Sequence, residues 1–108
     1  MKIYYGERGS GKTLKTIQLS IEKQMPIICW SYEHKKYIEH EAYKLGVQRK
    51  LPEPILVREV RQKIIGSRKG LIIDDLDTLL RIILNDNIYY ATMEDCDITH
   101  IEENDNYE

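Results

Sequence analysis

The chain has few cysteines and no long apolar stretch. Cys29 lies in an apolar run and Cys96 in an acidic segment, and these are its two cysteines. Their spacing predicts neither a metal site nor a disulfide, so we expect both to be reduced thiols. No apolar stretch approaches the ~20 residues that cross a bilayer, and the N-terminus leads straight into the first expected strand, which leaves no room for a signal peptide. We therefore expect a cytoplasmic protein without membrane contact.

Histidine is also scarce. His34, His40 and His100 stand among polar residues. His34 and His40 are six residues apart, a spacing that does not align them on one face of a helix. We therefore expect all three side chains to be solvated.

The length and the charge distribution predict one domain with an acidic end. At 108 residues the chain has little room for a lid or a second domain. Seven of the 18 acidic residues lie from Glu94 onward, which leaves an excess of +5 over the first 93 residues. Such a body can approach nucleic acid or simply offset its own acidic end. Because residues 102–108 cannot bury a core face, we expect a domain over 1–101 and a disordered tail.

A glycine-rich segment near the N-terminus carries the most specific motif. Gly6 to Thr13, G-E-R-G-S-G-K-T, match the phosphate-binding loop pattern G-x-x-x-x-G-K-[ST]. In this pattern the lysine, Lys12, contacts the β and γ phosphates of a nucleoside triphosphate, and the Thr13 hydroxyl binds Mg²⁺. Lys2–Tyr5 is β-prone and Thr13–Lys23 has apolar residues at helical spacing. The loop is therefore expected to join a strand to a helix N-terminus, as phosphate binding requires.

The motif also predicts roles for single residues of the loop. Gly6, Gly9 and Gly11 are expected to take backbone conformations closed to residues with a Cβ, so that successive N–H groups curl around an anion. Arg8 either helps to neutralise the triphosphate or points to solvent. The alternative for the whole segment is a glycine-rich turn that contains Gly-Lys-Thr by chance. The expected triphosphate-binding residues are Gly6, Glu7, Arg8, Gly9, Ser10, Gly11, Lys12, Thr13 and Leu14.

A second motif ends in two carboxylates. Gly70 to Asp75, G-L-I-I-D-D, is the apolar run of a buried strand followed by Asp74 and Asp75. Such a strand end can hold Mg²⁺, and we expect Asp74 to do so, through water. The alternative is that both aspartates cap the helix that begins near Leu76.

With these two motifs the chain resembles the P-loop NTPase superfamily, with Gly6–Thr13 as Walker A and Leu71–Asp75 as Walker B. The I-D-D-L-D string at 73–77 is most similar to RecA-like and AAA-type ATPases and helicase loaders. There, Asp75 would take the place of a glutamate that polarises the attacking water, and the shorter side chain implies slow hydrolysis or help from a partner. The branch also has a later strand that ends in a polar sensor residue. Ile88–Thr92 fits this strand, with Thr92 as the sensor, although threonine also suits strand ends for structural reasons.

Alternating β-prone and helical segments predict a three-layer α/β/α P-loop fold with a mostly parallel central sheet of about five strands and a ligand at their carboxyl ends. The order of elements matches the superfamily over most of the first 93 residues, and the two motifs match at residue level. The expected strands are Lys2–Tyr5, Pro26–Trp30, Ile55–Val57, Leu71–Ile73, Ile88–Thr92 and Ile98–Ile101. The expected helices are Gly11–Lys23, Glu33–Leu45, Arg58–Ile65 and Leu76–Leu84.

The resemblance implies an ATP-binding protein with Mg²⁺-dependent ATPase activity in a DNA-processing or assembly complex. A homo-oligomer or a protein partner would supply an arginine, and nucleic acid is a further candidate partner. The alternatives are a nucleotide-dependent switch or loader with little hydrolysis, and a small nucleoside or nucleotide kinase. The compact chain, rich in Ile, Lys and Tyr, is similar to products of AT-rich bacterial phages or mobile elements. The expected catalytic residues are Lys12, Asp75 and Thr92, and the expected Mg²⁺ ligands are Thr13 and Asp74.

Overall fold

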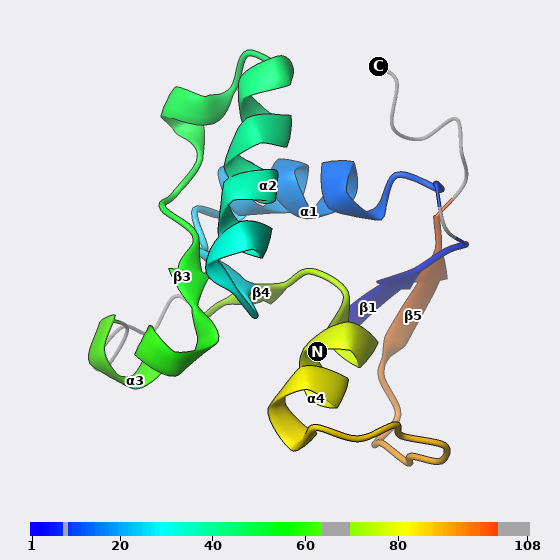
Figure 1. Cartoon of the computed structure of the whole chain (residues 1–108). Helices are drawn as coiled ribbons and strands as arrows, with labels where there is room; N and C mark the ends of the chain where they lie inside the picture. Colours follow the sequence, from blue (N-terminus) through cyan, green and yellow to red (C-terminus); the bar gives the residue numbers. More distant parts are fainter. Residues whose placement is uncertain (8, 64–69, 102–108) are drawn as a thin grey trace.

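Strands and helices alternate along the chain, and the computed structural model describes residues 1–7, 9–63 and 70–101 (Figure 1). The strands in these ranges are β1 (Lys2–Tyr5), β2 (Ile27–Cys29), β3 (Ile55–Leu56), β4 (Ile72–Ile73) and β5 (Asp97–His100). The helices are α1 (Lys12–Lys23), α2 (Tyr32–Lys44), α3 (Val60–Lys63) and α4 (Leu76–Leu84), with short 3-10 helices at Gln48–Lys50 and Val57–Glu59. Most expected elements therefore have a counterpart at nearly the same position.

The strands form two parallel sheets. β1 pairs with β5, and Ile3 lies opposite Ile98. β2 lies between β3 and β4, with Ile28 opposite Ile55 on one side and Ile73 on the other. The expected α/β class with parallel strands is thus confirmed. The expected single sheet of about five strands is not seen, because in the described ranges neither β1 nor β5 pairs with a strand of the three-stranded sheet.

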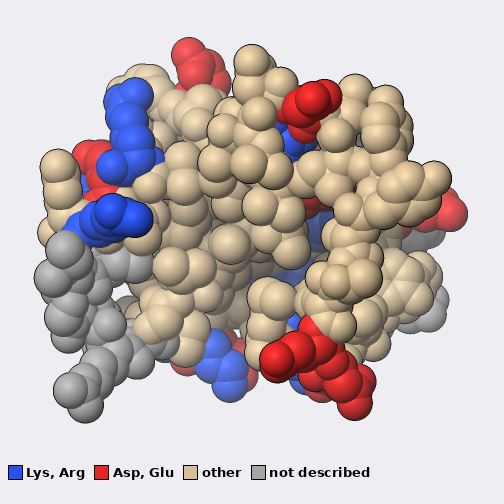
Figure 2. Space-filling model, turned by 90° about the horizontal axis from the view of Figure 1, so that it is seen from below, with Lys and Arg blue, Asp and Glu red and all other residues tan. Residues whose placement is uncertain are grey.

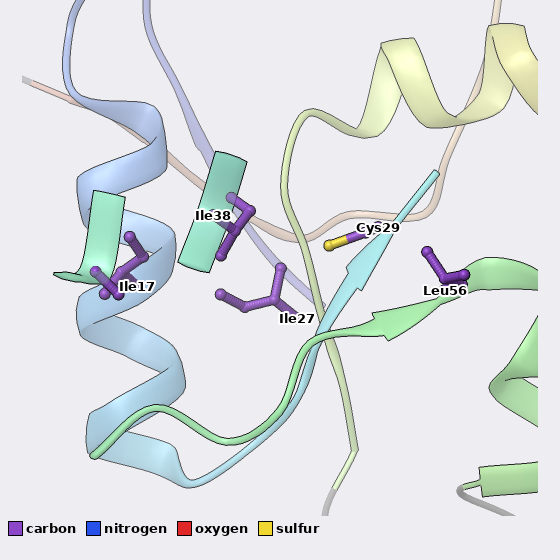
Figure 3. Packing of buried hydrophobic residues seen from close by; sticks show 6 residues of the cluster. Ile17, Ile27, Cys29, Ile38 and Leu56 are labelled. Atoms are coloured by element: carbon purple, nitrogen blue, oxygen red, sulfur yellow. The ribbon is translucent and has the colours of Figure 1, made fainter. Parts of the chain in front are cut away.

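The main core lies between the three-stranded sheet and the helices α1 and α2. Ile17 of α1, Ile27 of β2 and Ile38 of α2 are fully buried in one cluster (Figure 3). Burying such a side chain stabilises a fold by about 1.5–3 kcal/mol, so these residues anchor both helices on the sheet. The cluster is completed by Cys29, Ala42 and Leu56. This packing fixes the position of α1, and with it the end of the loop that precedes α1.

Hydrogen bonds define the end of α1 and the start of α2. Gln24 follows α1 with a left-handed φ of 53°, and its N–H donates to the Ser20 carbonyl. Ser31 precedes α2, and its Oγ accepts the N–H of His34 at 3.1 Å. This N-cap provides a partner for an amide that has none within the helix. It also holds the first turn of α2, which carries His34.

The expected strand Ile88–Thr92 does not form. Residues 87–94 have no regular secondary structure, and Tyr89 and Tyr90 are 80% and 95% exposed. A strand needs a neighbour for its backbone hydrogen bonds, and this segment pairs with no strand in the described part of the chain. The last strand, β5, pairs with β1 and lies close to the expected Ile98–Ile101.

Some expectations fall outside the described residues. Arg8 of the loop belongs to this group, as do the part of the expected helix Arg58–Ile65 beyond Lys63 and the tail 102–108. The domain boundary at residue 101 and the role of Arg8 therefore stay predictions.

Candidate functional site

The loop between β1 and α1 has left-handed glycines where the motif predicts them. Gly9 and Gly11 have φ angles of 82° and 91°, which residues with a Cβ rarely adopt. The Ser10 N–H donates to the Glu7 carbonyl at 3.0 Å and closes a turn. Gly6 differs from the other two, because its φ is not left-handed and a Cβ built there would lie 2.9 Å from the Ser10 Cβ. Gly6 is therefore needed for space, which corrects the expectation that all three glycines provide special backbone angles.

Lys12 folds back over this loop. It is the first residue of α1, and its Nζ donates to the carbonyl oxygens of Gly6 and Glu7 at 3.1 and 3.0 Å. An ammonium group has three protons, so two carbonyl partners leave one proton for a further acceptor. The loop thus holds a full positive charge close to its own backbone.

The N-terminus of α1 adds backbone donors to this charge. The Lys15 N–H donates to the Gly11 carbonyl at 3.0 Å, the first such bond of the helix. The amides of Lys12, Thr13 and Leu14 come before it and have no carbonyl partner within the helix. No side chain that the structure describes caps this end, and its first turn carries no acidic residue. Together with Lys12, these amides form a positively polarised array that suits a phosphate.

Thr13 and Leu14 border a hollow between α1 and α2. Its volume is about 480 Å³, and its other lining residues are Ile17, Glu41, Lys44 and Leu45. Tyr37 of α2 interacts with Thr13. Burial and then the Glu41 charge raise the pKa of Tyr37, and a side-chain hydrogen bond with Thr13 offsets part of this effect. The expected Mg²⁺ ligand Thr13 therefore lies on the side of α1 that faces α2.

Asp74 lies against the second turn of α1. It follows β4 directly and is 4% exposed. Its Oδ1 accepts a hydrogen bond from Thr16 Oγ1 at 3.2 Å, and its Oδ2 accepts one from His34 Nε2 at 3.0 Å. Thr16 is about one helical turn after Thr13. The carboxylate that ends the second motif therefore lies beside the N-terminal half of α1.

Two further acidic residues stand at the start of α4. Asp75 has the N-cap position with a φ of 62°, but its side chain makes no capping hydrogen bond, so capping does not account for it. A hydrogen bond between the two carboxyl groups raises the pKa of Asp75 and lowers the pKa of Asp77. The Lys12 charge also contributes to the lowered pKa of Asp77. Asp77, which the motifs do not single out, thus lies within electrostatic range of the loop lysine.

His34 was expected in solvent, and this prediction is wrong. The residue is 5% exposed, and its ring stacks on Trp30 with the ring centroids 3.4 Å apart. The Nδ1 atom accepts the backbone N–H of Trp30 at 3.3 Å. The signal that could have located it is its four-residue spacing with Ile38 and Ala42, which places all three on the buried face of α2. His40 and His100 are exposed, as expected.

Thr92 is not brought to this site. It is exposed and lies in the segment before β5. Because β1 and β5 are parallel, that segment approaches the amino end of the pair, whereas the loop follows the carboxyl end of β1. The sensor role expected for Thr92 therefore has no support from this arrangement, and the missing strand at Ile88–Thr92 is the reason.

No protein-family model, curated protein or solved structure matches the chain. No helix in the described ranges is long and apolar enough to span a membrane. The same ranges contain no group of three or more His, Cys, Asp or Glu side chains arranged to hold a metal ion. Mg²⁺ usually keeps several waters and binds through one or two carboxylates together with substrate phosphates. A single carboxylate such as Asp74 is therefore compatible with this ion only when phosphates are also bound.

Proposed function

We propose that the chain binds a nucleoside triphosphate with Mg²⁺ at Gly6–Thr13 and hydrolyses it as an ATPase. The observation that carries this proposal is the Lys12 ammonium, held on the loop carbonyls at the uncapped start of α1. A cation, amides without helical partners and left-handed glycines together provide the chemistry that a polyphosphate needs. The finer fold assignment, a three-layer P-loop domain, belongs to the same proposal. Parallel strands alternating with helices support it.

The proposed residues have separate tasks. Lys12 would neutralise the β and γ phosphates, and the loop amides would bind their oxygens. Thr13 and Asp74 would hold Mg²⁺, which neutralises charge on the phosphates during transfer. Asp74 suits this task because a carboxylate has about four acceptor positions, and hydrogen bonds from Thr16 and His34 fill two of them.

Asp75 bears on whether binding leads to rapid hydrolysis. It would orient the attacking water, but its carboxyl group shares a hydrogen bond with Asp77, which raises its pKa. The hydrogen bond with Asp77 thus already occupies part of the carboxyl group that would accept a proton from the attacking water. This observation favours, as a second candidate, a nucleotide-dependent switch that loads or regulates a DNA-processing complex with little hydrolysis.

The proposed chemistry also calls for a partner. Phosphoryl transfer often uses an arginine supplied by another subunit. α4 and the segment after it expose many apolar side chains, and Figure 2 shows that uncharged residues cover most of this side of the molecule. Exposed apolar patches of this kind mark interaction sites, so a second copy or a partner protein would bind here. The exposed side chains are those of Leu80, Ile82, Ile83, Leu84, Ile88, Tyr89, Tyr90 and Met93.

Equilibrium binding of ATP in the presence of Mg²⁺ tests the role of Lys12. Hydrogen bonds to charged groups contribute about 1.5–3 kcal/mol, so Lys12→Ala should weaken binding about 10- to 100-fold without unfolding the protein. Lys15→Ala is the matched control, because it removes the same charge from the same helix. Its Nζ lies 4.9 Å from the centre of the Tyr4 ring and makes no contact with the loop carbonyls that Lys12 binds. Unchanged affinity in a folded Lys12→Ala protein would contradict the assignment.

Phosphate release separates the candidate functions. The assay would use ATP and Mg²⁺ with no DNA, with single-stranded DNA and with double-stranded DNA. Steady release supports the ATPase, whereas tight binding without release supports the switch. ADP that forms only with an added nucleoside, without free phosphate, indicates a kinase, because the phosphoryl group is then transferred to the nucleoside. A wild-type protein that binds neither ATP nor GTP would disprove the proposed function as a whole.

A further inference from the structure

A buried hydrogen-bond network links α2 to the acidic tip of β4. Asp74 lies between Thr16 of α1 and His34 of α2, and all three residues are buried. His34 is in turn stacked on Trp30 and accepts its backbone N–H. A buried carboxylate without hydrogen-bond donors would be strongly disfavoured, so these contacts matter for Asp74 more than surface contacts would.

The two donors to Asp74 are not equivalent. Thr16 has one hydroxyl proton, and its Oγ1 lies 2.9 Å from the Lys12 carbonyl as well as 3.2 Å from Asp74 Oδ1. That proton is shared between two acceptors. A backbone N–H can only donate, so His34 Nδ1 must be the acceptor of the Trp30 N–H. The proton of the neutral ring is then on Nε2, 3.0 Å from Asp74 Oδ2. His34 is thus the donor committed to Asp74.

We propose that His34 is a positioning residue that orients the Asp74 carboxylate toward the cation accompanying the triphosphate. This inference rests on the proposed function. One committed donor fixes the rotation of the carboxylate, and the remaining lone pairs stay available for a cation or its water. Groups that hydrogen-bond to a carboxylate ligand of a metal typically change metal affinity or activity 10- to 100-fold when mutated.

The neighbours of His34 hold it in this orientation. The Ser31 side chain caps the helix at the His34 N–H, and the Trp30 ring covers one face of the imidazole with an interplanar angle of 13°. Trp30 is the chain's single tryptophan. Its fluorescence therefore reports on the ring that contacts Asp74, without any measurement of activity.

The test compares triphosphate affinity with Mg²⁺ and with EDTA in three variants. His34→Phe keeps an aromatic ring beside Trp30 but removes the Nε2 donor, and we expect the affinity gain from Mg²⁺ to fall about 10-fold or more. His34→Gln provides an amide donor and should retain most of that gain. His40→Phe makes the same aromatic substitution at an exposed position of α2 and should behave as wild type. Affinity in EDTA should be the same in all three, because it depends on the loop.

Trp30 fluorescence provides the second measurement. In the wild type, adding triphosphate with Mg²⁺ should change the emission more than adding triphosphate with EDTA. If His34→Phe does not fold, the inference is tested by the Trp30 emission of the wild type and by the Mg²⁺ effect on the affinity of His34→Gln.

Three results would overturn the inference. The first is an unchanged Mg²⁺ effect in folded His34→Phe, and the second is equal loss in His34→Gln and His34→Phe, which would indicate a packing role. The third is a Trp30 emission that does not respond to Mg²⁺ while nucleotide binds. In all three the wild type still binds triphosphate, so the proposed function stands. A wild type that binds none removes both proposals.

Discussion

Gly6 and Gly9 serve the loop for different physical reasons, and alanine substitutions should distinguish them. A Cβ at Gly6 would collide with the buried Ser10 side chain, whereas a Cβ at Gly9 meets no atom within 4 Å but forces alanine into a left-handed φ. Overpacking costs about 1–3 kcal/mol, so Gly6→Ala should lower the free energy of unfolding by that amount. Gly9→Ala should cost about 1–2 kcal/mol from backbone strain alone.

Adding Ser10→Gly to each alanine variant makes this prediction specific. Ser10→Gly removes the side chain that Gly6→Ala would strike, so the double variant should regain part of the lost stability in urea unfolding. It should give no such rescue to Gly9→Ala. Equal rescue of both would argue against a steric role for Gly6.

The two cysteines should differ in reactivity. Burial, and then the Asp74 charge, raises the pKa of Cys29 from 9.0 to about 12, whereas Cys96 is partly exposed. The thiolate is the reactive form, so at pH 8 iodoacetamide should label Cys96 in the native protein and both residues in urea. Because the folded protein keeps the Cys29 proton that the unfolded chain loses, this group's contribution to stability should decline as the pH rises from 9.0 toward 12.

Mass spectrometry of the labelled protein gives the check. Cys96→Ser should abolish native labelling, and Cys29→Ala should leave it unchanged. Rapid labelling of Cys29 in the native wild type would show that the core around β2 opens readily.

Features that depend on adjacent residues could be predicted from the sequence, and contacts between distant residues could not. The left-handed Gly9 and Gly11 and the position of Lys12 follow from a local pattern. The hydrogen bond between His34 and Asp74 joins residues 40 positions apart. Nothing next to either residue indicates the other, although the spacing of His34 with Ile38 marks its buried face.

At the scale of elements, the N-cap of α2 should contribute to the stability of the protein. It also holds the helix turn that carries His34. The Ser31 hydroxyl accepts the His34 N–H, and replacing such a cap with alanine typically costs about 1 kcal/mol. Ser31→Ala should therefore lower the free energy of unfolding by about this amount, measured by urea denaturation. Ser31→Asp should preserve stability, because aspartate is an equally good N-cap. Equal losses in the two variants would contradict the capping role.

Helices were easier to predict than strands because their signals are local. The bounds of α4, Leu76–Leu84, are those expected from the sequence. The apolar Ile88–Thr92 has the composition of a strand, yet the more polar Asp97–His100 pairs with β1. β-propensity reflects how side chains fit a half-buried sheet, and the availability of a partner strand decides whether a strand forms.

At the scale of the whole molecule, alternation predicts the α/β class but not how strands divide between sheets. β4 is two residues long and forms an edge of its sheet, and Ile72 and Ile73 are only half-buried, although their apolar run is typical of a strand covered on both faces. The number of hydrogen-bonded neighbours of a strand depends on the distant residues that reach it. The number of neighbouring strands therefore cannot be predicted from the sequence of the strand alone.

The exposed apolar face of α4 and the following segment should drive self-association. Leu84 is 60% exposed, so Leu84→Asp places a charge on this face without opening a cavity in the core. Sedimentation velocity of the wild type should show a larger species as protein concentration rises, and Leu84→Asp should shift it toward monomer. Tyr43→Asp, on an exposed position of α2, should not. A wild type that stays monomeric with and without nucleotide would exclude a second copy, and a different protein would then be the partner that covers this face.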